Sequence, residues 1–85
     1  MKNFTPEKSK QIALARLDLV HKWLEFRKKS QNKLQADYDF VKLHNTSNSH
    51  LFEILGKISR RSLHRWYSML NGTEDYTKLI MYFFY

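Results

Sequence analysis

A run of basic and hydroxyl side chains at residues 57–65 is the part of this sequence best suited to contact with a polyanion. The segment 56–70 reads Gly-Lys-Ile-Ser-Arg-Arg-Ser-Leu-His-Arg-Trp-Tyr-Ser-Met-Leu and contains no acidic residue. Guanidinium groups offer paired N–H donors, which match phosphate oxygens and the acceptor edge of guanine. We therefore expect seven candidate DNA-binding residues: Lys57, Ser59, Arg60, Arg61, Ser62, His64 and Arg65.

The spacing of this run divides it between two faces of a helix over 59–70. At 100° per residue, one face carries four large apolar or aromatic side chains: Leu63, Trp66, Tyr67 and Leu70. The opposite face carries polar and basic side chains: Arg60, Arg61, His64, Arg65 and Ser68. One face can pack on a core while the other enters the major groove, as a recognition helix requires.

The expected role of each candidate follows from its place in this helix. Ser59 is suited to be the N-cap, because its hydroxyl can accept a backbone N–H of the first turn. Arg60 and Arg61 lie nearest the groove floor, where a bidentate arginine–guanine contact is worth roughly 1–3 kcal/mol of discrimination. We expect base-edge or phosphate contacts from His64 and Arg65. Phosphate contacts are expected from three further residues: Lys57, Ser59 and Ser62.

The residues before this helix fit the order of a helix-turn-helix over about 49–70. A short apolar helix at 49–55 is followed by Gly56 in the turn, the apolar Ile58 and the capping Ser59. The connection Gly-Lys-Ile-Ser is longer by one residue than the tightest form of the motif. The sequence therefore predicts a helix-turn-helix with an extended turn.

The pattern at 58–67, Ile-Ser-Arg-Arg-Ser-Leu-His-Arg-Trp-Tyr, resembles the N-terminal DNA-binding segments of Mu-type phage and bacterial transposases. In that family a phrase like Ser-x-x-Thr/Ser-Leu-x-Arg-Trp follows a short helix. Two upstream stretches also resemble it, Ile-Ala-Leu-Ala-Arg-Leu-Asp-Leu-Val at 12–20 with Trp23, and Ala-Asp-Tyr-Asp-Phe at 36–40. The resemblance spans residues 5–79 and ends where the apolar tail begins.

This resemblance implies a segment that binds element-end or regulatory DNA, upstream of a catalytic domain with an acidic triad on an RNase-H-like fold. The 85 residues have no room for that domain, so the expected role is non-catalytic. The implied location is the bacterial cytoplasm, in association with the nucleoid. The tail at 79–85 is then either folded back on the core or a truncation point.

Composition sets the outer limits of these expectations. The formal charge is +7, which favours anionic partners, and there is no cysteine, which excludes disulfides and thiolate metal sites. No apolar run is long enough for a transmembrane helix, so no membrane partner is expected. The length fits a single domain over 1–85.

The order of caps and breakers predicts an all-α bundle of four to five helices. The expected helices cover 6–29, 33–44, 49–55 and 59–70, and 73–75 can start a fifth. Asn71-Gly72 predicts a stop, and 45–49 predicts a loop. The first helix should bury eight apolar side chains: Ile12, Ala13, Leu17, Leu19, Val20, Trp23, Leu24 and Phe26. In the second, packing is expected along one apolar side: Leu34, Tyr38, Phe40, Val41 and Leu43.

Residues for catalysis or metal binding are not grouped in this sequence. His44 and His50 match no standard zinc spacing and are expected to be solvated, and Asp37 and Asp39 should point to different helix faces. No glycine-rich phosphate loop is present. We therefore expect no enzyme activity, no cofactor, no metal and no small-molecule substrate.

Two other classes of function remain open at this point. A helical interaction or oligomerisation module could use the wide apolar face of the first helix and the tail 79–85, with self-association as its result. The basic run 57–65 has no purpose in such a module, which is why DNA binding is preferred. Association with a membrane surface ranks last, because Lys78 is the single charge near the aromatic tail.

Overall fold

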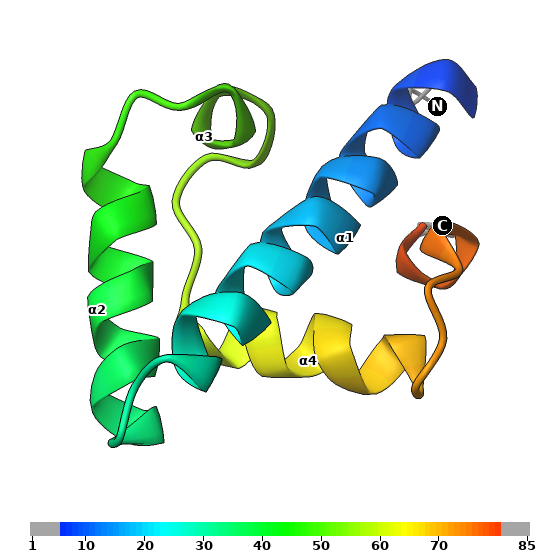
Figure 1. Ribbon diagram of the computed structural model, residues 1–85. Coiled ribbons are helices and arrows are strands. Elements are labelled where there is room, and N and C mark those ends of the chain that lie inside the picture. Colours follow the sequence, from blue (N-terminus) through cyan, green and yellow to red (C-terminus); the bar gives the residue numbers. More distant parts are fainter. Residues whose placement is uncertain (1–5, 81–85) are drawn as a thin grey trace.

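Five helical elements follow one another along residues 6–80, which are the residues that the computed structural model describes (Figure 1). They are α1 (Pro6–Lys28), α2 (Lys33–Thr46), α3 (His50–Leu55), α4 (Arg60–Leu70) and the short 3-10 helix η1 (Tyr76–Leu79). The long helix α1 packs against all four of the others, and α4 also packs against α2 and η1. The expected all-α bundle is confirmed.

Local capping explains where most of these elements begin and end. Ser49 and Ser59 are the N-caps of α3 and α4, and their hydroxyls accept the N–H groups of Phe52 and Ser62, each at 3.2 Å. Asn71 then ends α4 in the left-handed conformation, with φ of 50°. The predicted N-cap Ser59 and the predicted stop at Asn71 are therefore confirmed.

The connection between α3 and α4 is held by the end of α2. The Asn45 side chain donates to the Ile58 carbonyl and accepts the Ile58 N–H, both at 2.9 Å. The buried His44 donates from Nε2 to the Gly56 carbonyl at 2.8 Å. The predictions that α2 ends at residue 44 and that His44 is solvated are thus wrong, because α2 continues to Thr46 and both side chains bind this connection.

Gly56 allows the chain to leave α3 in the direction that this connection needs. Its φ is +71°, a conformation that side-chain-bearing residues rarely adopt. In Figure 1 the residues after it run as an extended segment from α3 to the start of α4, and the two helices lie apart. The order of elements is that of the predicted motif, but the helix-turn-helix itself stays a prediction.

The buried face of α2 differs from the expected one by roughly a quarter turn. Leu34, Tyr38 and Leu43 are exposed, whereas Asp37 and Phe40 are buried. The reason is that Asp37 takes the place of an apolar residue in the core, where it accepts a hydrogen bond. A second correction concerns Tyr67, which was expected to be buried but keeps 49% of its surface exposed.

The core itself lies where α1 crosses α4 and η1. Trp23 is at its centre, with Leu63 of α4 and Leu79 of η1, and all three are fully buried. Of the eight α1 side chains expected inside, four are buried and four partly buried: Ala13, Leu19, Val20 and Trp23 are buried, and Ile12, Leu17, Leu24 and Phe26 are partly so. The fifth element is a 3-10 helix that begins at Tyr76, directly after the expected start at 73–75, with Asp75 as its N-cap. Residues 81–85 of the tail lie outside the described part.

Candidate nucleic-acid interface

The first part of the candidate site is a group of polar side chains around a buried carboxylate, which we call the Asp37 corner: Trp23, Arg27, Asp37, Arg60 and His64. Asp37 is 2% exposed. Its Oδ1 accepts the indole N–H of Trp23 at 2.8 Å and lies 3.0 Å from Arg27 Nε. Its Oδ2 accepts from His64 Nε2 at 3.1 Å and lies 3.7 Å from Arg60 Nε.

Helical spacing brings these groups together from three elements. Trp23 and Arg27 are four residues apart on α1, and Arg60 and His64 are four apart on α4, so each pair shares a face. Figure 1 shows the C-terminal end of α1, the first turns of α2 and the start of α4 meeting at one corner of the bundle. Asp37 of α2 therefore faces both pairs at once.

The second part of the site is the outer face of α4, formed by Arg61, Arg65 and Ser68. All three side chains are exposed, and they lie between about 80° and 140° from Arg60 around the helix. Within residues 6–80, neither Arg61 nor Arg65 has an ion pair with an acid. This face therefore presents positive charge that the described part of the chain does not neutralise.

Arg16 of α1 lies on the other flank of this face. Its guanidinium lies 5.2 Å from the centre of the Trp66 ring, and its Nη1 donates to the Leu79 carbonyl at 2.9 Å. Burial lowers the pKa of Arg16, and the positive charge of Arg65 lowers it further. The two like charges are thus held close enough to repel each other.

The remaining candidates lie at the start of α4. Lys57 and Ser59 are exposed, and Ser62 is half-buried. The hydroxyls of Ser59 and Ser62 lie 3.2 Å apart within the cap. Two of the seven sequence candidates, Arg60 and His64, contact the Asp37 carboxylate. The other five do not: Lys57, Ser59, Arg61, Ser62 and Arg65.

Sequence reasoning missed Asp37 and Arg27 as members of this site. Asp37 shares the buried side of α2 with Ala36 and Phe40, but the apolar pattern of the sequence favoured a different side as the buried one. An inward carboxylate needs donors, and the tryptophan and arginine spaced by four on α1 are suitable ones. The missing information was that α1 and α2 cross at this point.

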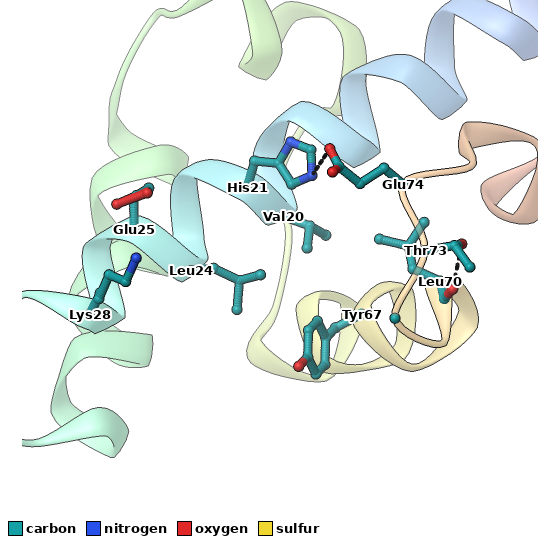
Figure 2. A pocket seen from close by; sticks show the side chains of 10 residues that line it. Val20, His21, Leu24, Glu25, Lys28, Tyr67, Leu70, Thr73 and Glu74 are labelled. Carbon is teal, nitrogen blue, oxygen red and sulfur yellow. Dashed lines mark hydrogen bonds and ion pairs between the residues drawn. The ribbon is translucent and has the colours of Figure 1, made fainter.

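A groove on another side of α1 contains none of the seven candidates. It has a volume of about 600 Å³ and lies between α1, α4 and residues 72–74 (Figure 2). Its floor is apolar, with Val20, Leu24 and Leu70, and Tyr67 stands at its edge. The His21 ring closes one end through a 3.5 Å contact with Glu74.

Comparison with known proteins gives no match to this chain among family models, curated proteins or solved structures. Within residues 6–80, no helix has the length and apolar character needed to cross a membrane. The same residues bring no three histidine, aspartate or glutamate side chains together as metal ligands. The site is therefore judged on its own geometry.

Proposed function

We propose that this protein binds double-stranded DNA with the outer face of α4. The observation that carries the proposal is that Arg61 and Arg65 are exposed, one helical turn apart, and without an acidic partner in residues 6–80. A helix with buried apolar residues on one side and such arginines on the other has the form of a groove-binding helix.

The electrostatics of the flanks support the same surface. Arg16 and Arg65 repel each other, and Arg60 starts α4 at the positive end of its dipole. A DNA backbone placed along α4 reduces the repulsion between these positive charges and releases counterions from the DNA. Phosphate contacts supply most of the affinity, and Arg61 and Arg65 are the residues that reach base edges.

The test is a titration of a fluorescently labelled duplex at two salt concentrations. We expect the affinity to fall as salt rises, and Arg61→Gln combined with Arg65→Gln to weaken binding by at least about tenfold. The control is the pair Lys10→Gln and Lys42→Gln, which removes the same charge from exposed positions on α1 and α2. The proposal is wrong if the affinity for duplex is the same at both salt concentrations, or if the two double variants bind duplex with equal affinity.

The finer part of the proposal concerns context. The resemblance of 58–67 to Mu-type transposase segments supports a non-catalytic DNA-binding part of a recombination protein, located with the bacterial nucleoid. A duplex from the end of a mobile element is then bound more tightly than a scrambled duplex. Equal affinity for both removes the transposase interpretation and leaves general DNA binding in place.

A second candidate function is an interaction or oligomerisation module. It is favoured by one observation, the half-exposed Tyr67 at the edge of the apolar groove between α1 and α4. This alternative predicts that the chain sediments as an oligomer, that Tyr67→Ser makes it monomeric, and that Arg61→Ala has no effect. A monomer that binds duplex DNA contradicts it.

A further inference from the structure

Two arginines in the Asp37 corner have more positive charge and more donors than their carboxylate can use. Arg27 and Arg60 are permanently charged, and Asp37 supplies one negative charge to both. His64 adds a further charge whenever it is protonated. The corner therefore has a surplus of at least one positive charge, held within a few ångströms of a buried group.

Most N–H donors of these two guanidinium groups have no acceptor in residues 6–80. Each guanidinium has five N–H bonds. Within residues 6–80, the single hydrogen bond that either makes runs from Arg60 Nη1 to the Tyr38 hydroxyl, at 3.4 Å. Both side chains approach Asp37 through a buried Nε, so their terminal amino groups remain for another acceptor.

Aromatic rings hold both guanidiniums in place. The Arg27 guanidinium lies 5.0 Å from the centre of the Trp23 ring, and that of Arg60 lies 5.1 Å from the centre of the Tyr38 ring. The side chains of Arg27 and Arg60 are 27% and 37% exposed, so both reach solvent. A fixed, solvent-accessible guanidinium loses little entropy on binding, and its planar donors match a phosphate group.

We propose that Arg27, Arg60 and His64 form a binding site for one phosphate group, with Asp37 as the positioning residue that fixes all three. The phosphate is a backbone phosphodiester of the DNA that α4 contacts, so this source of the ligand rests on the proposed function. Arg60 stands at the start of α4, beside the outer face, and a phosphate bound there sets the register of the helix on the duplex.

The first arm of the test uses inorganic phosphate and the full chain. The side-chain N–H signals of Arg27 and Arg60 and the ring signals of His64 are followed by NMR, with chloride as the matched salt. We expect saturable shifts confined to these three residues. Arg27→Gln and Arg60→Gln should each weaken phosphate binding by about tenfold, whereas the charge-matched Lys42→Gln should change it less than about twofold.

The Trp23 indole N–H signal shows whether each variant keeps the corner folded, because that group donates to Asp37. Arg60→Lys is the second variant, since it keeps the charge and removes the planar donors. Compared with Arg60→Gln, the Arg60→Lys variant should regain the stability of the fold but only part of the affinity for phosphate. Shifts that never saturate, or equal weakening by Arg27→Gln and Lys42→Gln, overturn the site in favour of general screening.

The second arm uses the labelled duplex and separates this site from the proposed function. We expect Arg27→Gln to lower the salt slope by about one. If Arg27→Gln binds duplex like the unaltered chain while Arg61→Gln is weakened, the phosphate site is wrong and DNA binding stands. If phosphate binds as expected but no duplex binds, DNA binding is wrong and the source of the ligand is a free phosphate group.

Discussion

The Asp37 corner and the outer face of α4 contain neighbouring arginines of very different kinds. Arg60 is bound between Asp37 and the Tyr38 ring, while the next residue, Arg61, is exposed and lacks an acidic partner in the described residues. The difference arises because successive helix residues are 100° apart, and Asp37 of α2 contacts the side of α4 that carries Arg60 and His64. Some residues of one basic run can thus stabilise the fold while their neighbours are available to bind a ligand.

The largest effect expected is on the corner. Asp37→Asn removes the one negative charge that Arg27 and Arg60 share and should lower the free energy of unfolding by about 3 kcal/mol. Chemical denaturation measures this change. Asp39→Asn is the matched control, because Asp39 is exposed and should change stability by less than about 0.5 kcal/mol. Similar values for both variants contradict a structural role for the corner.

A loss of comparable size is expected from Trp23→Phe. The substitution keeps a large aromatic ring but removes the indole N–H that donates to Asp37 at 2.8 Å. A hydrogen bond to a charged group is worth about 1.5–3 kcal/mol, and the lost ring volume adds to this. Combining Trp23→Phe with Asp37→Asn in a double-mutant cycle should give a clearly non-additive sum. Additive effects indicate that the two side chains do not depend on each other.

On the outer face of α4 we expect a substitution to change the affinity for duplex DNA and to leave the stability of the fold unchanged. Arg61→Ala should weaken duplex binding by about tenfold and change stability by less than about 0.5 kcal/mol, because its side chain is exposed. Arg60→Ala should affect both measurements, since Arg60 also contacts Asp37. If Arg60→Ala and Arg61→Ala give the same pair of changes, the division between the two surfaces does not exist.

Features set by neighbours in the sequence were predictable. The cap Ser59, the stop at Asn71 and the bounds of α4 all follow from a few adjacent residue types. The α2 face was not predictable in the same way. Leu34 and Tyr38 look like core residues, yet they are exposed because Trp23 gives Asp37 a buried partner from another helix.

The same distinction holds for the candidate site. The basic run fixes which residues lie at the start of α4, and hydrophobic spacing turns Leu63 and Trp66 inward. It does not show that His64 and Arg60 meet a carboxylate 27 and 23 residues upstream in the sequence. That pairing depends on the Asn45 amide, which holds Ile58 and so places the start of α4 against α2.

The smallest predicted effect concerns the exposed carboxylate of Asp75, which contrasts with the buried Asp37. Hydrogen bonds from the Thr77 hydroxyl and backbone N–H lower the pKa of Asp75 below its ordinary value. A lowered pKa stabilises the fold above the unfolded value, and this contribution is lost as the pH falls through the folded value.

Asp75→Asn should therefore remove a small acid-range component of the stability–pH curve and leave the curve near neutral pH almost unchanged. Urea titrations from pH 2 to pH 7 measure it. If the acid range of the curve is the same in Asp75→Asn and in the unaltered chain, the Thr77 contacts do not lower the pKa of Asp75 enough to affect stability.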